Sequence, residues 1–289
     1  MVILLVVALV SVSSSSIFAR YLPAVPAVVI AFWRMTTASC LLWGFSSVKP
    51  QGSISRSNAR KTVLAGVFLG LHFAFFFGAL KLTSVANATV LATMAPVFTA
   101  LIERFGFKRP WNRDVFSGLI VAVLGAILIR GTDTGFLHGN QLGNLLALLS
   151  SLWMAVVLLV AEQIRQKTAT IVYSRLVYTI AGITLLLIAI AFSYPLFVFS
   201  YRDFTWLFLL GLIPTVVGHT SFNYAVKYIR PTIVASVPLG EPIIASALAW
   251  FLLREPIATN VLLGGVLVLV GLYRITKKRS VSGFQNDNL

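Results

Sequence analysis

The sequence predicts an all-α membrane protein whose ten transmembrane helices form two inverted five-helix repeats around a central cavity. Three observations predict this fold class. First, hydrophobic residues make up 58% of the 289-residue chain, only 11% of residues are charged, and the mean hydropathy is +0.92, whereas about 25% of the residues of a typical soluble domain are charged. Second, apolar runs long enough to cross a bilayer recur along the whole chain. Third, the two halves share a weak internal repeat.

The internal repeat relates residues 79–128 to residues 225–274. The two segments align without a gap at a displacement of 146 positions, and eight of the fifty positions are identical: an alanine, a lysine, a phenylalanine, a valine, two prolines and two glycines. Because the prolines, the glycines and the lysine coincide, we interpret the match as a duplication. Each predicted copy has an odd number of helices, so the second copy enters the membrane from the opposite side and the repeat is inverted.

The first half begins with an apolar run that we interpret as a transmembrane helix. A cleaved secretory signal would be followed by a mature domain, whereas here another apolar run follows Arg20 at once. Pro23 and Pro26 predict a turn between the first two helices, and the polar loop 49–61 and the basic loop 104–113 separate later ones. The helices predicted in this half are 2–19, 25–48, 62–80, 84–103 and 114–130.

The glycine-containing loop at residues 131–141 is the predicted boundary between the repeats. The second half follows the same plan as the first, and its predicted helices are 142–162, 170–192, 204–226, 232–253 and 257–275. We therefore expect a first five-helix repeat at residues 1–134, a second at residues 135–276, and a cytoplasmic tail at residues 277–289.

The distribution of lysine and arginine predicts the orientation. With the N-terminus inside, sixteen of the 23 cations fall in the inner loops and tail and five on the outer side. Because cytoplasmic loops collect cations, we expect both termini to be cytoplasmic and the chain to lie in the cytoplasmic membrane. The cations are spread over alternate loops instead of gathering in one patch, which favours contact with lipid head groups over nucleic-acid binding.

Four short motifs carry a resemblance to a known family. They are Ala31-Phe32-Trp33-Arg34-Met35, Ala79-Leu80-Lys81, Leu239-Gly240-Glu241-Pro242 and Phe251-Leu252-Leu253-Arg254-Glu255-Pro256. With the ten-helix plan, they resemble the drug/metabolite transporter superfamily, and within it the EamA-type permeases, over nearly the whole chain. The resemblance implies a pseudo-symmetric helical bundle around a central cavity that moves small metabolites, often amino acids or amphipathic solutes, commonly outward. The chain departs from the family pattern at Lys108-Arg109-Pro110, which replaces the glutamate usual after the fourth helix.

Inverted repeats are characteristic of secondary transporters whose substrate site lies near the midplane between the halves. We therefore expect secondary active transport of a small metabolite, an amino acid or an amphipathic solute, by alternating access and in the direction of efflux. An exchanger of anionic phosphate- or nucleotide-bearing solutes with the same fold is the alternative. A membrane enzyme or scaffold is disfavoured, because the sequence has no Walker A loop, no metal-spaced cluster and no nucleophile motif. We accordingly expect no enzymatic activity, no catalytic residue, no cofactor and no metal site.

Glu241 is the one acidic residue placed near the middle of a predicted span, and it precedes Pro242 directly. A charged side chain inside a bilayer is costly, and a proline within a helix removes a backbone donor and bends or unwinds the helix. One hypothesis is that Glu241 exchanges a proton, the candidate coupling ion, or a substrate ammonium during transport. The alternative is a structural clasp, in which its protonated carboxyl binds a backbone carbonyl that the proline leaves free.

His72 and His219 occupy nearly matching positions in the two repeats. We expect both to face a shared cavity, although a neutral histidine bonded to a neighbouring helix is the structural alternative for each. His219 lies on a mixed polar helix stripe with Asn223. The further candidates for the cavity wall are Asn87, Trp153 and Tyr178.

Arg34 and Arg175 correspond between the repeats at a displacement of 141 positions. Two guanidinium groups facing one cavity would bind a phosphate or a carboxylate, which makes this pair the candidate anion site. The alternative is that each arginine extends to the membrane surface or bonds backbone carbonyls and so stabilises the fold.

Overall fold

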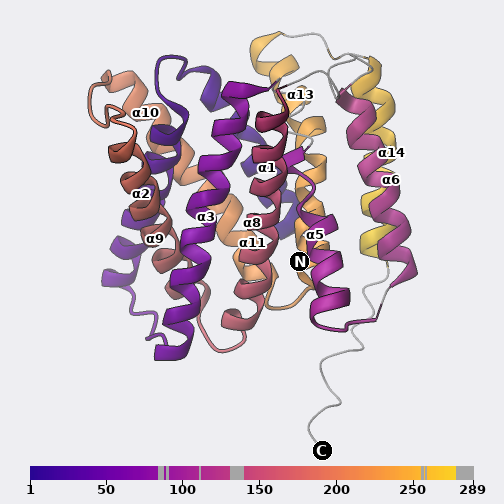
Figure 1. Ribbon diagram of the computed structural model, residues 1–289, viewed down its shortest axis with the longest axis horizontal. Coiled ribbons are helices and arrows are strands. Elements are labelled where there is room, and N and C mark those ends of the chain that lie inside the picture. The colour runs from indigo at the N-terminus through magenta and orange to yellow at the C-terminus, as the bar shows by residue number, and fades with distance from the viewer. Residues whose placement is uncertain are drawn as a thin grey trace, which may run out of the picture.

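The chain folds into helices that run roughly parallel to one another (Figure 1). The computed structural model describes residues 1–83, 88, 91–110, 112–130, 140–254, 257 and 259–277. Asn87, most of the predicted repeat boundary and the tail beyond residue 277 lie outside these residues. The helices of the first half are α1 (Val2–Arg20), α2 (Ala27–Val48), α3 (Arg56–Leu82), α5 (Ala95–Leu101) with the π-helical segment η1 (Ile102–Gly106), and α6 (Arg113–Arg130).

The second half is divided into more helical segments than the first. It contains α8 (Gln141–Arg165), α9 (Thr170–Ala191), α10 (Tyr201–Leu210), the π-helical segment η2 (Gly211–His219), α11 (Thr220–Ala225), α12 (Pro231–Ser236), the 3-10 segment η3 (Val237–Gly240), α13 (Glu241–Leu253) and α14 (Thr259–Lys277). Segments α10, η2 and α11 follow one another without a break, as do α12, η3 and α13. Each trio therefore forms one membrane-length helix whose geometry changes along its length.

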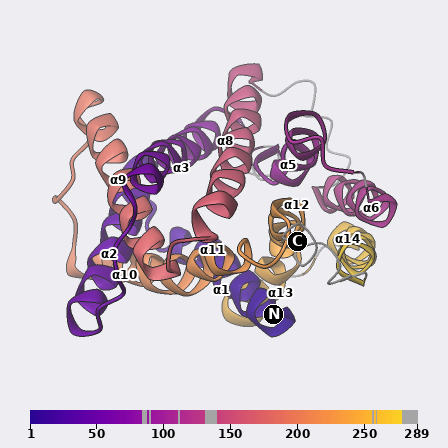
Figure 2. The same ribbon diagram turned by 90° about the horizontal axis from the view of Figure 1, so that it is seen from below.

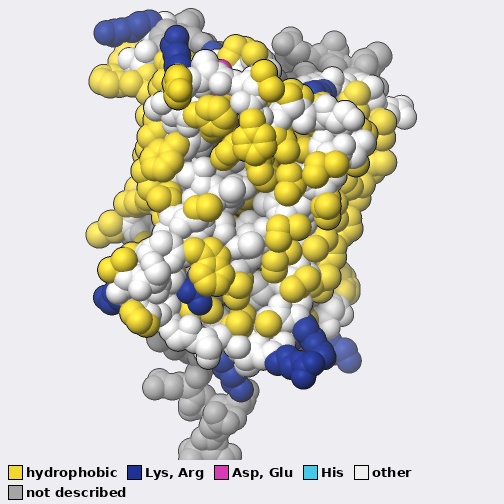
Figure 3. Space-filling view, turned by 90° about the vertical axis from the view of Figure 1, so that its left-hand side faces the viewer, with side chains coloured by type: hydrophobic (Ala, Val, Ile, Leu, Met, Phe, Trp, Pro, Cys, Tyr) yellow, Lys and Arg dark blue, Asp and Glu magenta, His cyan; other side chains and the backbone are white. Residues whose placement is uncertain are grey.

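Seven helical stretches among the described residues are long and apolar enough to span a membrane, and the apolar helix at Thr259–Ile275 is shorter. The spans explain why large hydrophobic side chains such as Ile3 and Leu187 are exposed. Figure 3 shows a wide band of hydrophobic and uncharged side chains on one face, with lysine and arginine toward its upper and lower ends. This pattern is that of a multi-pass membrane protein; the arrangement of ten helices in an inverted repeat stays a prediction.

Side-chain caps account for two of the differences from the predicted boundaries. Helix α3 begins at Arg56, six residues before the predicted start at Thr62, because the Ser55 side chain accepts a hydrogen bond from the backbone of Asn58 and caps the helix. Helix α10 begins at Tyr201, not at Phe204, because Ser200 and Asp203 form a capping box in the preceding turn. Polar residues that the sequence placed in loops thus begin these two helices.

The bundle has a large apolar core, formed chiefly by buried residues of α1, α2, α3, α8 and α9. Helices α6 and α14 pack against each other at one edge of the bundle, where the view from below places them side by side (Figure 2). Their backbones approach closely at Gly118, Gly125, Gly264 and Gly271, since a Cβ atom at any of these glycines would lie 2.5–2.7 Å from a backbone atom of the other helix. Small residues allow such close contact between membrane helices.

Candidate functional site

Six residues from four helical stretches come together inside the bundle. Arg34 belongs to α2, His72 and Phe73 to α3, Thr215 and His219 to η2, and Glu241 is the first residue of α13. We call this group the Arg34 cluster. It is formed by residues up to about 200 positions apart in the sequence, so its assembly depends on the packing of the helices and not on any local motif.

Arg34 lies at the centre of the cluster and is only 5% exposed. Its Nε donates a hydrogen bond of 2.8 Å to Oγ1 of Thr215, and its guanidinium carbon lies 4.9 Å from the ring centre of Phe73. It also interacts electrostatically with Glu241. A buried guanidinium is costly unless it is paired and hydrogen-bonded; the hydrogen bond and the ring contact, with the carboxyl group of Glu241 nearby, reduce that cost.

Glu241 begins α13 directly after the 3-10 segment η3, which contains Pro238, and Pro242 follows it. The helix therefore changes geometry at the position where the sequence combines an acidic residue with two prolines. Glu241 is half-buried. Within the described part of the chain its carboxyl group makes no hydrogen bond, and both hypotheses for it stay predictions.

The rings of both histidines contact Phe73. Nδ1 of His72 lies 2.8 Å from the backbone oxygen of Ser150 in α8, and the His72 ring contacts the Phe73 ring at 4.8 Å. The His219 ring meets the same phenylalanine edge-on at 5.9 Å. His72 and His219 also interact electrostatically with each other and with Arg34. The structure thus brings together four sequence candidates: Arg34, His72, His219 and Glu241.

Tyr178 and Asn223 form a hydrogen-bonded group next to the cluster. Nδ2 of Asn223 donates to Oγ of Ser174 at 3.0 Å and to the Tyr178 hydroxyl at 3.3 Å. The Tyr178 hydroxyl also lies 3.2 Å from Oγ1 of Thr220. Both candidates are buried and hydrogen-bonded to other side chains. This group therefore joins α9 to α11 next to the Arg34 cluster.

Two candidates lie elsewhere. Trp153 in α8 stacks on Phe68 of α3 with ring centres 4.9 Å apart, and its buried indole nitrogen has no hydrogen-bond partner among the described residues. The Arg175 guanidinium lies over the exposed ring of Trp43 at 4.2 Å. The contacts of Arg34 and Arg175 have no residue in common, so the structure does not bring the two guanidinium groups together.

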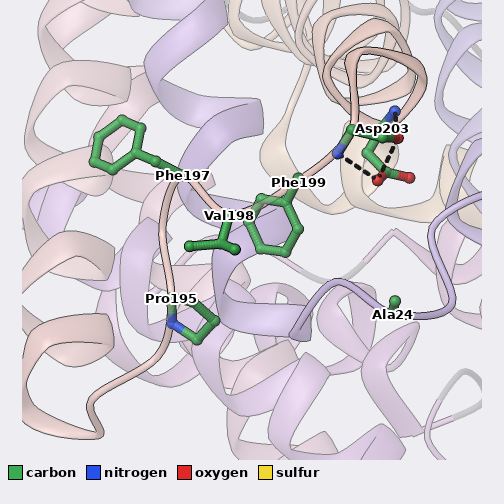
Figure 4. Close-up of a pocket in the computed structure, with 7 residues that line it drawn as sticks. Ala24, Pro195, Phe197, Val198, Phe199 and Asp203 are labelled. Carbon is green, nitrogen blue, oxygen red and sulfur yellow. Dashed lines mark hydrogen bonds between the residues drawn. The ribbon is translucent and has the colours of Figure 1, made fainter.

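A surface depression of about 570 Å³ lies apart from the Arg34 cluster, at the connection between α9 and α10 (Figure 4). It is wide open, and the carboxylate of Asp203 at its edge is occupied by the capping bonds with Ser200. The lining residues are Ala24, Pro195, Phe197, Val198, Phe199, Ser200 and Asp203. These residues are mainly apolar and the one carboxylate is already bonded. The depression therefore offers fewer polar groups for binding a polar solute than the Arg34 cluster does.

Sequence analysis missed the two residues that hold Arg34 in place. Phe73 is one of several phenylalanines in α3, and nothing in its spacing distinguishes it from the others. Thr215 lies on the same polar stripe as His219, which was a signal for it, but its role depends on the π-helical segment η2 and on α2, which packs against it. Contacts of this kind are set by tertiary packing.

Comparison with known proteins gives the same class of protein. The sequence model of the EamA-like transporter family matches residues 1–131 and 141–277. An uncharacterized transporter of Archaeoglobus fulgidus is 26% identical over 235 residues, which cover 80% of this chain and 82% of the relative. The pseudopaline exporter CntI of Pseudomonas aeruginosa is 24% identical over 255 residues, which cover 88% of this chain and 87% of the exporter.

A solved structure, titled only as the crystal structure of a protein, shares the fold. It superimposes with a TM-score of 0.80 over 95% of this chain and 96% of that chain, at 16% sequence identity. The family match extends over most of the chain, and the relatives are named as transporters or exporters. The protein is therefore a multi-pass membrane protein that belongs to the EamA-like transporter family.

Proposed function

We propose that the chain is a secondary active transporter of the cytoplasmic membrane, and that it moves a small metabolite outward by alternating access with the Arg34 cluster as part of its substrate site. The observation that carries the proposal is the placement of a buried guanidinium and a carboxyl group within electrostatic range of each other, between α2, η2 and α13. Buried ionisable residues in a membrane bundle mark substrate or ion pathways.

The cluster suits a solute that carries both a carboxylate and an ammonium group, as an amino acid does. The Nη atoms of Arg34 have no hydrogen-bond acceptor within the described residues, so they are free to bind the solute's carboxylate. Glu241 would bind the ammonium group or take up a proton when the site is empty. Phe73 and the histidine rings provide apolar surface for the rest of the solute.

Three observations support alternating access and efflux. The family model matches the chain in two segments of similar length. The connections after the first helix of each segment lie at opposite ends of the bundle. Tyr21, which follows α1, stacks on Trp206 of α10 and so lies near the end of α9 that leads into α10. Residues 166–169, which follow α8, directly precede the other end of α9. Connections at opposite ends are what an inverted pair of segments would have, and an inverted pair favours alternating access. One relative is named as an exporter, which favours outward movement.

The test is transport in proteoliposomes loaded with a mixture of labelled amino acids, with and without an imposed pH gradient. We expect efflux of at least one amino acid by the unmodified chain and loss of the response to the pH gradient in Glu241→Gln. Asp203→Asn is the matched control, because it makes the same chemical change at a half-buried position outside the cluster. Glu241→Gln transport that responds to pH as before would remove the coupling role.

The alternative is exchange of anionic phosphate- or nucleotide-bearing solutes. Its support is the same free guanidinium edge of Arg34, but Arg175, the second cation it would use, lies over Trp43. A single buried arginine facing a glutamate matches a dianionic phosphate less well than a zwitterion, because Glu241 would repel it. Counterflow of phosphate esters in the absence of amino-acid counterflow would decide for this alternative.

A further inference from the structure

A second group of polar and charged side chains lies at one end of the bundle, away from the Arg34 cluster. It contains Glu103 in η1, Arg109 in the connection after η1, Glu162 near the end of α8 and Thr232 near the start of α12. The two glutamates and the threonine are buried, and the Arg109 side chain is 29% exposed. We call this group the charge bridge.

Arg109 binds both carboxylates of the charge bridge. Its Nη1 donates to Oε1 of Glu103 at 3.0 Å and to Oε1 of Glu162 at 3.1 Å, and its Nη2 donates to Oε2 of Glu162 at 2.8 Å. Oγ1 of Thr232 donates to the remaining Glu103 oxygen at 2.8 Å. All four carboxylate oxygens therefore have a donor, which is the condition under which a buried ionic network is stable.

Arg109 remains charged in this position. Burial on its own lowers the pKa of its guanidinium, but the hydrogen bond to Glu162 and the charges of both glutamates outweigh that effect and raise the pKa above its usual value. Arg230, which donates from Nη1 to the backbone oxygen of Pro110 at 3.4 Å, adds a second positive charge near Glu103. Two positive charges, those of Arg109 and Arg230, therefore lie near the two glutamates.

The charge bridge joins the two segments that the family model matches. Glu103 and Arg109 belong to residues 1–131, and Glu162 and Thr232 to residues 141–277. The bridge lies where α8 ends and α12 begins, near the lower end of the bundle in Figure 1. It thus connects the two halves at one end, and a movement that separates the halves there must break it.

The charge bridge shares the continuous stretch of α12, η3 and α13 with the Arg34 cluster, and α8 contacts the cluster through His72, but the bridge lies nearer one end of the bundle. Thr232 and Glu241 are nine residues apart, which corresponds to about 14 Å along a helix. Ser150, whose backbone oxygen contacts His72, is twelve residues before Glu162 in α8, or about 18 Å. Segment η3 lies between Thr232 and Glu241, so a change of helix geometry at η3 would act on both sites.

We propose that the charge bridge is the gate at this end of the transport pathway: intact, it closes the approach to the Arg34 cluster, and broken, it lets the two halves separate. The inference rests on the proposed transport function, because alternating access requires each end to close in turn. A two-pronged contact between a guanidinium and a carboxylate depends strongly on geometry, so it is either made or lost. This end of the bundle would therefore have two states, closed and open, instead of a continuous range of separations between the halves.

The gate is tested by measuring the distance between the halves by electron paramagnetic resonance. Spin labels are placed at Arg104→Cys and Lys167→Cys, exposed positions on either side of the bridge, in a Cys40→Ser background reconstituted in lipid. We expect mainly short distances with the bridge intact. In Arg109→Gln the ratio of open to closed molecules should rise at least about tenfold, because two buried carboxylates lose their shared cation.

The control is Lys61→Gln, which removes a contact between the same halves at the same end. Nζ of Lys61 donates to Oε1 of Gln163 at 3.0 Å, but this contact is exposed, and exposed polar contacts contribute little. Its distance distribution should equal that of the unmodified bridge. If Arg109→Gln is folded and also shows the unmodified distribution, the gate proposal is wrong.

A charge exchange covers the possibility that Arg109→Gln fails to fold. Glu162→Arg alone should open this end, and Arg109→Glu together with Glu162→Arg should close it again, because the cation then lies on α8 between two carboxylates. A folded double variant that stays open overturns the proposal. The distances are measured without any substrate, so they report the opening of this end independently of transport. A chain that opens and closes as expected but transports nothing would refute the proposed function, while the control of this end by the charge bridge would stand.

Discussion

Arg34 is bound by residues of two other helical segments, and this separates it from the arginine that corresponds to it in the second half. Its Nε bonds Thr215 and its guanidinium lies against Phe73, whereas Arg175 lies over an exposed tryptophan. From the sequence alone the two arginines form a pair, because their positions in the two repeats correspond. Their environments differ because each half contributes different neighbours, which a count of residues along the chain does not reveal.

Arg34→Gln should reduce transport or solute affinity at least about tenfold, since a hydrogen bond to a charged group contributes about 1.5 to 3 kcal/mol. Arg175→Gln, the matched change outside the cluster, should stay within about fivefold of the unmodified chain, because its partner is the exposed Trp43 and an exposed contact of this kind contributes about 0.5 to 1 kcal/mol. Uptake into proteoliposomes measures both. Equal losses in the two variants would restore the two-arginine anion site.

Thr215→Val should destabilise the protein by about 1 to 3 kcal/mol, because it keeps the shape of the side chain but leaves Nε of the buried Arg34 without an acceptor. Thermal unfolding of the purified protein in detergent measures the loss. Thr99→Val is the control: Thr99 is also buried, but among the described residues its hydroxyl bonds only Pro96 in its own helix. A melting temperature of Thr215→Val equal to that of the control would show that the Arg34 contact does not stabilise the fold.

The candidate site was partly predictable from single residues. Glu241 is identified by elimination, because every other acidic residue falls at a helix end, in a loop or in the tail of the predicted topology. His72 and His219 follow from their matching positions, and the structure places both against Phe73. The hydrogen bond between Arg34 and Thr215 was not predictable, because it joins residues 181 positions apart. The charge bridge was missed because glutamates at helix ends are usually solvated, and only the structure shows these two buried.

At the scale of elements, apolar runs and prolines located the helices, but not their internal geometry. The π-helical segment η2 contains Pro214 within a run that the sequence describes simply as one helix. Segment η3 contains Pro238, four residues before Pro242, the proline that led us to expect a break near Glu241. Whether a proline produces a kink, a π-helical turn or a 3-10 turn depends on which neighbouring helix fills the space, so the form of each break could not be predicted.

The close approach of α6 and α14 leads to a prediction that two adjacent glycines can test. A Cβ atom at Gly264 would lie 2.5 Å from the backbone oxygen of Gly125, whereas the nearest atom to one at Gly265 is a side-chain carbon of Ile243 at 3.5 Å. Gly264→Ala should therefore destabilise the protein by about 1 to 3 kcal/mol or more. Gly265→Ala should be neutral or slightly stabilising, because alanine favours the helix by up to about 1 kcal/mol.

The two alanine variants gain the same helix propensity, so the difference between their unfolding temperatures isolates the packing between α6 and α14. The measurement is thermal unfolding of both variants in the same detergent, with the unmodified chain alongside. If Gly264→Ala unfolds at the temperature of Gly265→Ala, the two helices separate more easily than the structure indicates, and close contact at the four glycines does not hold this pair together.

At the scale of the whole molecule, the duplication makes a prediction about the faces of the membrane. The connection that contains Ala24 follows α1, and the connection that contains Gln166 follows α8; these are the first helices of the two matched segments. In a parallel repeat the two connections would lie on the same side of the membrane. In an inverted repeat they lie on opposite sides, and the distribution of cations assigns Ala24 to the outer face and Gln166 to the cytoplasm.

Ala24→Cys and Gln166→Cys, each introduced into Cys40→Ser, separate these arrangements because both positions are exposed. A membrane-impermeant maleimide added to intact cells should label Ala24→Cys and leave Gln166→Cys unlabelled, and permeabilised cells should show labelling of both. Labelling of both variants in intact cells would mean that the repeats are parallel. With parallel repeats the two halves would not exchange roles across the membrane, so alternating access through them would lose its physical basis. Reversed labelling would keep the inversion and overturn only the cytoplasmic placement of the termini.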